Sequence, residues 1–178
     1  MTEEEIIQGC LIKDERSQHT LFQQYAGKLM AVCQRYASDQ KEAEDMLQEA
    51  FIRIFSNIHQ FRNAGPFGGW VKKITVNAAI QVLRNKKIRF SEFPEDQTHL
   101  LNTDPNVFSD LGAEELLKLI SQLPEGYRVV FNLYVLEGYT HEEIAQILHI
   151  RTATSRSQLS KARAALKEKI NSIQKIPG

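Results

Sequence analysis

Residues 142–170 read EEIAQILHIRTATSRSQLSKARAALKEKI, and this stretch predicts two helices joined by a tight turn. Thr140 and Glu143 form the spaced pair of a capping box, which marks the start of the first helix. The turn holds His149, a residue type that tolerates a left-handed backbone conformation better than most. We expect the second helix to begin near Thr152 as its N-cap. Small and apolar residues supply a shared core: Ile144, Ala145, Leu148, Ile150, Leu159 and Ala162. The pattern is typical of a helix-turn-helix.

The second of these helices carries a segregated charge, although the formal net charge of the 178-residue chain is zero. No carboxylate lies between Glu143 and Glu168, whereas the cations there are Arg151, Arg156, Lys161, Arg163 and Lys167. Ser155, Leu159, Ala162 and Leu166 define its core face. We predict duplex DNA contact for the opposite side and its flanks, through Thr154, Arg156, Ser157, Gln158, Ser160 and Lys161. The alternative is a basic face that is simply exposed to solvent. The missing acids argue against it, because an ordinary exposed helix carries both positive and negative residues.

A second stretch, from Ala50 to Ser91, also lacks Asp and Glu and contains a glycine-rich loop at residues 61–69. Aromatic residues around the loop are followed by cations: Phe61, Phe67 and Trp70, then Lys72, Lys73, Arg84, Lys86 and Lys87. Exposed aromatic rings beside cations suit single-stranded nucleic acid, because bases stack on the rings while the backbone follows the charge. Alternatively, the aromatic residues are core residues, and for Trp70 both roles are compatible.

The chain divides into three segments by periodicity and composition. Residues 1–90 have helical periodicity, with Phe22 on the apolar face of one helix and Ser38 or Asp39 as the N-cap of the next. Residues 91–112 hold two prolines and five acids without Lys or Arg, and residues 113–178 are again helical. We therefore predict an all-α protein with two small helical domains joined by an extended acidic linker.

Several classes of protein do not fit the composition. No apolar run has the length of a membrane span, and the acidic start MTEEE differs from a basic secretory signal, so we expect a cytoplasmic protein. Cys10 and Cys33 are too few for a disulfide framework and are expected to be reduced packing residues. No histidine has metal-ligand spacing, and we predict neither metal nor cofactor. Glu44, Asp45 and Glu49 lack the partners of a catalytic site, which argues against an enzyme.

Two blocks carry a family resemblance. EAEDMLQEAFIRIFSNIHQFRNAGPFGGWVKKITVNAAIQVLRNKK (residues 42–87) resembles region 2 of the extracytoplasmic-function (ECF) subfamily of bacterial sigma factors. LPEGYRVVFNLYVLEGYTHEEIAQILHIRTATSRSQLSKARAAL (residues 123–166) resembles their region 4. The resemblance implies a subunit that binds core RNA polymerase and directs promoter recognition and transcription initiation. A stand-alone helix-turn-helix regulator is the alternative, but it leaves the first block without a role.

The resemblance also implies site residues and partners. Docking on the polymerase is implied for Glu44, Asp45, Gln48, Glu49 and Phe51. Contact with the single-stranded −10 region is implied for Arg62, Asn63, Phe67, Trp70, Lys72, Lys73, Asn77, Arg84, Lys86 and Lys87. Contact with the −35 duplex is implied for the residues predicted above together with Arg151. Partners would be core RNA polymerase, promoter DNA and an anti-sigma factor, without a small-molecule substrate or membrane insertion.

The chain departs from the family pattern at three places. Gln81 replaces a usual Asp, and Arg151-Thr152-Ala153 replaces the usual Pro-x-Gly entry to the recognition helix. Ser155 replaces a β-branched apolar core residue. We expect these differences to alter the promoter sequences that are preferred rather than the fold.

Overall fold

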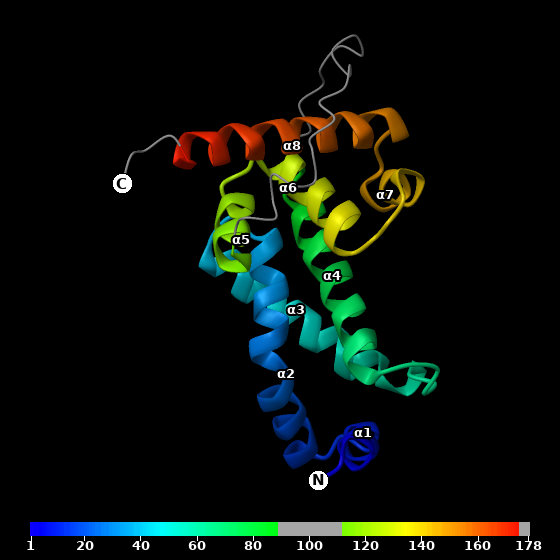
Figure 1. Cartoon of the computed structure of the whole chain (residues 1–178). Helices are drawn as coiled ribbons and strands as arrows, with labels where there is room; N and C mark the ends of the chain where they lie inside the picture. Colours follow the sequence, from blue (N-terminus) through cyan, green and yellow to red (C-terminus); the bar gives the residue numbers. More distant parts are fainter. Residues whose placement is uncertain (89–111, 175–178) are drawn as a thin grey trace. The chain divides into compact units, whose positions relative to one another are not determined.

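The computed structural model describes residues 1–88 and 112–174, and every regular element in these ranges is helical. The chain divides into two compact units, Met1–Lys86 (unit 1) and Lys87–Gly178 (unit 2). The elements of unit 1 are α1 (Glu3–Leu11), α2 (Glu15–Tyr36), α3 (Gln40–Asn57), the short η1 (Ile58–Gln60) and α4 (Phe67–Asn85) (Figure 1). Those of unit 2 are α5 (Ala113–Ser121), α6 (Glu125–Phe131), the π-helical η4 (Asn132–Leu136), α7 (His141–Leu148) and α8 (Thr152–Gln174).

The all-α prediction is confirmed for these residues. Apart from Gly112, the predicted linker 91–112 lies outside the described ranges. The domain boundaries given above stay predictions.

Polar side chains begin the first helices of unit 1. Asp14 accepts a hydrogen bond from the N–H of Ser17, and Asp39 accepts one from the N–H of Glu42. Such caps satisfy backbone donors that have no partner within the helix, and each contributes about 1 kcal/mol. Of the two N-caps predicted for α3, the structure therefore selects Asp39.

The start of α4 differs from the prediction. The loop was predicted to extend to residue 69, but the helix begins at Phe67, and the carbonyl of Pro66 accepts hydrogen bonds from the N–H groups of Gly69 and Trp70. Two glycines in the first turn give the helix little intrinsic support. Burial of the Phe67 side chain, which is 2% exposed, contributes about 1.5–3 kcal/mol and favours this start.

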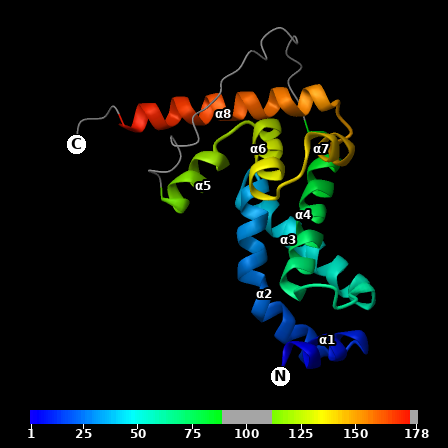
Figure 2. The ribbon, with the colours of Figure 1, turned by 45° about the vertical axis from the view of Figure 1, so that its right-hand side comes forward.

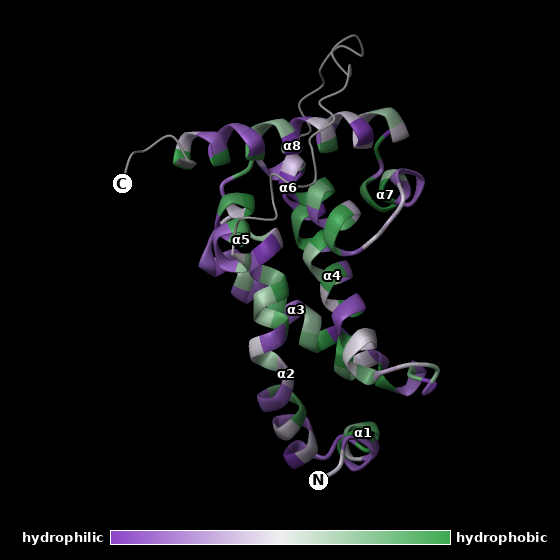
Figure 3. Cartoon of the chain, in the orientation of Figure 1, coloured by the Kyte–Doolittle hydropathy of each residue, from purple (hydrophilic) through white to green (hydrophobic). Residues whose placement is uncertain are grey.

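The core of unit 1 is made where α2, α3 and α4 pack on one another, with α1 against α2 (Figures 1 and 2). Figure 3 shows hydrophobic and hydrophilic residues alternating along α2, as expected of a helix that buries one stripe. The buried cluster of unit 1 contains Ile6, Ile7, Cys10, Leu21, Leu29, Phe51, Ile54, Ile58, Phe67 and Val71. Gly9 is required for the α1–α2 contact, since a Cβ there would lie 2.0 Å from the Ser17 hydroxyl oxygen.

An ion pair joins the start of α3 to the end of α4. Lys86 donates to the carboxylate of Glu42, 44 positions away in the sequence. The Glu42 side chain is 2% exposed, whereas that of Lys86 is 54% exposed. Glu42 also accepts hydrogen bonds from the N–H and the hydroxyl of Ser38. A carboxylate buried to this extent is stable only with such partners.

The predicted helix-turn-helix is present in unit 2. Thr140 and Glu143 form the capping box of α7, and His149 has the left-handed conformation at φ 55° and ψ 46°. The start of α8 is the one difference: Thr152 is already helical, and the carbonyl of Arg151 accepts from the N–H of Ser155. The residue before the helix is thus Arg151, whereas Thr152 was predicted to be the N-cap. Helix ends predicted from a side-chain pattern are commonly uncertain by one residue.

The remaining helices of unit 2 pack along α8. In Figures 1 and 2, α7 lies near the N-terminal end of α8 and α5 near its C-terminal half. Leu159, Ala162, Leu166 and Ile170 form the buried stripe of α8. Arg128 of α6 is 3% exposed and donates to the carbonyls of Ser121 and Leu123, and burial lowers the pKa of its guanidinium.

Within the described parts of the chain, no helix combines the length and apolarity needed to cross a membrane.

The pairing of Glu42 with Lys86 gives a stability test. Lys86→Met removes the cation that pairs with the buried Glu42 carboxylate, so we expect the free energy of unfolding of unit 1 to fall by about 1–3 kcal/mol. Adding Glu42→Gln removes the uncompensated charge and restores part of the loss. Chemical denaturation followed by circular dichroism measures both effects. Lys41→Met, at an exposed lysine of α3, is the matched control, and equal stability of the two lysine variants would contradict the pairing.

Candidate nucleic-acid and protein-binding surfaces

The residues predicted to contact duplex DNA occupy the first turns of α8 and the position before it. Arg151 and Arg156 are exposed. Partly buried positions are those of Thr154, Ser157, Ser160 and Lys161. Burial lowers the pKa of Lys161. The structure therefore brings these side chains to the N-terminal half of one helix, where the two arginines are the exposed members.

Gln158 does not belong to that exposed set. Its side chain is 1% exposed. It follows Ser155 by three residues and precedes Ala162 by four, and both of these are fully buried, so the helical period puts Gln158 beside the core stripe. Its assignment to the opposite side of the helix was wrong. In the described conformation, Gln158 is not presented to DNA.

A polar contact links the start of α7 to the fourth residue of α8. Nδ1 of His141 lies 2.8 Å from the hydroxyl oxygen of Ser155, whose side chain is fully buried. The imidazole also stacks on the Tyr134 ring, with centroids 4.4 Å apart and planes inclined by 20°. The Arg163 guanidinium lies over the same tyrosine at 5.9 Å from its centroid. Residues of η4, α7 and α8 thus meet at one point.

Charges around His141 favour its neutral form. Burial lowers its pKa below the ordinary value, and the cations Arg156 and Arg163 act in the same direction against Glu142. Glu142 also forms an ion pair with Arg156 at 3.7 Å, but both side chains are more than 60% exposed. A pair exposed to this extent contributes little to stability, so it leaves Arg156 available for other contacts.

Aromatic rings cluster around the first turn of α4. The ring centroids of Phe61, Phe67 and Trp70 lie 5.1–5.6 Å from one another. Phe67 is 2% exposed, which favours a core role over the predicted contact with DNA. Phe61 and Trp70 are partly exposed. The cluster therefore presents parts of two rings supported by a third from beneath.

The same cluster connects to α1 through Tyr25. The Tyr25 ring meets Phe67 edge-on at 5.6 Å, and its hydroxyl donates to Glu3 at 2.9 Å. Burial, together with the Glu3 carboxylate, raises the pKa of Tyr25 to about 12. Tyr25 therefore joins α1 to the aromatic cluster through its hydroxyl and its ring.

The polar residues predicted to contact the −10 strand are distributed along the loop, along α4 and over the two residues that follow α4. Exposed members are Arg62, Asn63, Lys73, Asn77, Lys86 and Lys87, and partly buried ones are Lys72 and Arg84. Asn63 and Lys87 have positive φ angles of 53° and 58°. The ammonium of Lys86 is engaged by the buried carboxylate of Glu42. Its charge is therefore partly neutralised within unit 1.

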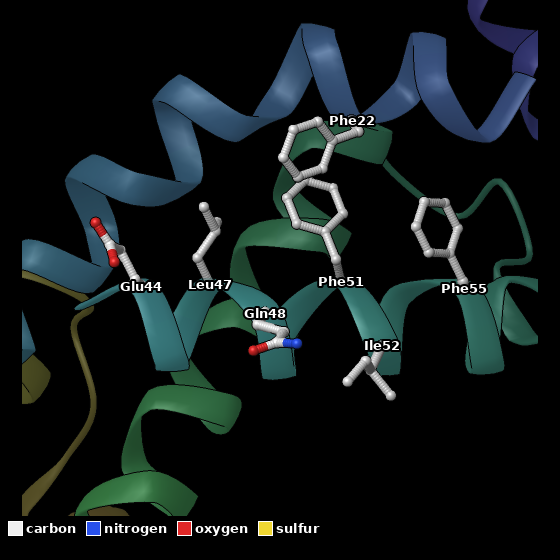
Figure 4. A pocket seen from close by; sticks show the side chains of 7 residues that line it. All are labelled: Phe22, Glu44, Leu47, Gln48, Phe51, Ile52 and Phe55. Atoms are coloured by element: carbon white, nitrogen blue, oxygen red, sulfur yellow. The ribbon is translucent and has the colours of Figure 1, made fainter. Parts of the chain in front are cut away.

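The face of α3 predicted to bind polymerase contains a shallow apolar groove of about 360 Å³. Figure 4 shows Phe22 of α2 lying over Phe51 of α3, with Leu47 and Phe55 on the same side. Gln48, Ile52 and Glu44 complete the lining. The rings of Phe22 and Phe51 are 4.7 Å apart. The groove is thus a continuous apolar surface with polar groups at its edge.

The predicted docking residues divide around this groove. Glu44, Asp45 and Gln48 are exposed, whereas Phe51 is 5% exposed and forms the floor. Glu49 is engaged by Arg53 at 2.8 Å. Two residues that line the groove, Phe22 and Ile52, were not predicted to bind a partner. Their side chains are 43% and 54% exposed, although the sequence pattern puts Phe22 on the apolar face of its helix. The signal for Ile52 is in the sequence, because it is a large apolar residue outside the buried stripe of α3.

Both cysteines of unit 1 lie in its core. Cys10 and Cys33 are free and buried, and burial raises the pKa of both thiols, that of Cys33 to about 12. A thiol with a raised pKa is a poor nucleophile. In residues 1–88 and 112–174, no cluster of three or more His, Cys, Asp or Glu side chains is arranged to hold a metal ion.

Comparison with known proteins identifies relatives for both units. Residues 21–88 match the family model for sigma-70 region 2, and residues 113–166 match that for sigma-70 region 4. The ECF RNA polymerase sigma factor SigE of Mycolicibacterium smegmatis is 32% identical to this chain. The alignment covers 83% of this chain and 59% of that protein's length. The ECF RNA polymerase sigma-E factor of Haemophilus influenzae is 28% identical, with 97% of each chain covered.

A solved structure of the sigma factor RpoE in complex with the anti-sigma factor NepR, from Bartonella quintana, has a TM-score of 0.49 and 18% identity, covering 88% of this chain and 98% of RpoE. The two family matches together include most of the chain, in the order region 2 and then region 4. This chain therefore belongs to the extracytoplasmic-function subfamily of bacterial RNA polymerase sigma factors.

Proposed function

We propose that this chain is a transcription initiation factor that binds core RNA polymerase and directs it to promoter DNA. The observation that carries the proposal is the order of two matches, region 2 followed by region 4, on two separate helical units. The chain then has no catalytic chemistry of its own, and it works in the cytoplasm together with the polymerase.

Unit 2 is proposed to read the −35 duplex by inserting the start of α8 into the major groove. Arg151 and Arg156 are exposed there, and arginine contacts guanine edges or phosphates in that groove. Hydroxyl groups and a further cation flank them: Thr154, Ser157, Ser160 and Lys161. The absence of a carboxylate between Glu143 and Glu168 supports this assignment, because an acidic residue would repel the DNA backbone.

Unit 1 is proposed to bind the −10 strand once it is unpaired. The partly exposed ring of Trp70 would stack on a base, supported by Phe67 from beneath. Arg62 and Asn63, exposed in the loop before α4, would recognise a base edge. Lys73, Asn77 and the neighbouring cations of α4 would follow the phosphates.

The groove on α2 and α3 is proposed as the docking site for a polymerase helix. Its floor is apolar, and Glu44, Asp45 and Gln48 lie at its edge. A helix with one apolar face and flanking basic residues is complementary to both features. We also propose an anti-sigma factor as a second partner, on the strength of family membership.

Transcription by the reconstituted enzyme tests the function. Purified chain and core RNA polymerase on DNA upstream of the chain's own gene should give specific initiation that requires both proteins. Trp70→Ala should reduce initiation about tenfold on duplex DNA, because the lost base–aromatic stack no longer offsets the cost of unpairing the strands. A pre-melted template has no such cost and should restore most of the activity. Gln60→Ala, at an exposed neighbour, is the control. Binding to duplex DNA without association with core polymerase would instead favour a stand-alone helix-turn-helix regulator.

Competition for core polymerase tests the groove. Ile52→Asp places a charge on the apolar surface and Phe22→Ala removes its exposed ring, so each should weaken binding about tenfold or more. A labelled sigma factor displaced from core polymerase provides the readout. Ile12→Asp changes another exposed apolar residue of unit 1, one that is 81% exposed and lies outside the groove. If Ile12→Asp weakened binding as much as Ile52→Asp, the groove would have no special role.

A further inference from the structure

Ser155 is a hydroxyl at a position where the helix-turn-helix needs to fill its core. The side chain is fully buried, on the same stripe of α8 as the buried Leu159 and Ala162. A buried hydroxyl without a partner costs about 1–3 kcal/mol. His141, from the first turn of α7, supplies that partner at 2.8 Å. The contact therefore compensates for a polar residue inside the α7–α8 interface.

The partner is itself held from two sides. The capping box of Thr140 and Glu143 fixes the backbone immediately around His141. The Tyr134 ring, 4.4 Å away and nearly parallel, fixes the plane of the imidazole. Because burial and the adjacent Arg156 and Arg163 lower the pKa of His141, the ring is neutral at neutral pH. A directional contact thus connects η4, α7 and α8.

We propose that the His141–Ser155 hydrogen bond positions the N-terminal turns of α8 for selective reading of the −35 duplex. The inference rests on the proposed function of unit 2. Ser155 lies between Thr154 and Arg156, both predicted to contact DNA, so movement of its backbone displaces these neighbours. Apolar packing alone is non-directional, whereas a hydrogen bond constrains distance and angle.

Discrimination between −35 sequences should depend on this hydrogen bond more strongly than the overall affinity for DNA does. Contacts with base edges require hydrogen-bond geometry of about 2.7–3.2 Å, whereas the attraction between cations and phosphates acts over longer distances. A small displacement of the start of α8 therefore weakens sequence-specific contacts and leaves charge-driven affinity. His141 and Ser155 act through the residues beside them and are positioning residues.

The matched variants Ser155→Thr and Ser155→Val isolate the hydroxyl. Both add the same volume at the buried site, and only threonine keeps the group that bonds to His141. The assay uses holoenzyme assembled from the full chain, and it compares initiation at the promoter of the chain's own gene with initiation at a copy whose −35 region is scrambled. We expect Ser155→Thr to preserve the wild-type ratio and Ser155→Val to lower it about fivefold.

A second pair of measurements applies if both substitutions at position 155 impair folding. His141→Phe keeps an aromatic ring against Tyr134 and removes the nitrogen, so it should also lower the −35 ratio about fivefold. Combined with Ser155→Ala, it should cause no further loss, because both changes remove the same bond. The controls are His19→Phe and Ser172→Ala, at exposed positions outside the interface.

The outcomes separate this inference from the proposed function. A wild-type ratio near one would mean that unit 2 does not read the −35 region, and both proposals would fail. A high wild-type ratio that is equally retained by Ser155→Thr, Ser155→Val and His141→Phe would overturn only the positioning role. Lower thermal stability of His141→Phe with an unchanged ratio would mean that the bond is merely structural, which also overturns it.

Discussion

The helical period couples what each helix buries to what it displays, and both units depend on this constraint. In α3, Ala43, Met46, Ala50 and Ile54 are fully buried, which necessarily turns Glu44, Asp45 and Gln48 outward. In α8, the stripe from Ser155 to Ile170 likewise determines that Arg156 points to solvent. The surfaces proposed to bind polymerase and DNA are therefore consequences of how two small cores are packed.

Buried polar groups add direction to that packing. Glu42 joins the start of α3 to the end of α4, Arg128 joins the end of α5 to α6, and Ser155 joins α8 to α7. Each group is costly to bury unless it is hydrogen-bonded, so each favours one arrangement of the helices over others with similar apolar burial. In a helical unit of this size, apolar contact alone constrains the relative rotation of helices less strongly.

The neutral total charge conceals an uneven distribution that suits a protein with several partners. The acid-free parts of α4 and α8 are compatible with a polyanion, while the exposed acids of α3 border an apolar groove. Two ion pairs change how much positive charge these surfaces present. Lys86 is partly neutralised by the buried Glu42, whereas the exposed pair of Arg156 with Glu142 is weak enough to be exchanged for a phosphate or base.

Local chemistry explains what the sequence alone determined. The Asp39 cap, the capping box of Thr140 and Glu143, and the left-handed His149 each depend on residues a few positions apart, and all were predictable. The family was also recognisable, because two motif-bearing blocks occur in the right order. Side-chain burial was less predictable: Gln158 and Phe67 lie in the core and Phe22 is exposed, since residues at the edge of a helical stripe can face either way.

Only the tertiary structure decided which distant residues meet. The pairing of Glu42 with Lys86, the stack of His141 on Tyr134, and the closure of the groove by Phe22 over Phe51 join residues from different helices. No periodicity encodes these contacts, because they depend on the angles and offsets at which helices pack. Sequence therefore specified the helices, their ends and the charge of their surfaces, and packing chose the partners of individual side chains.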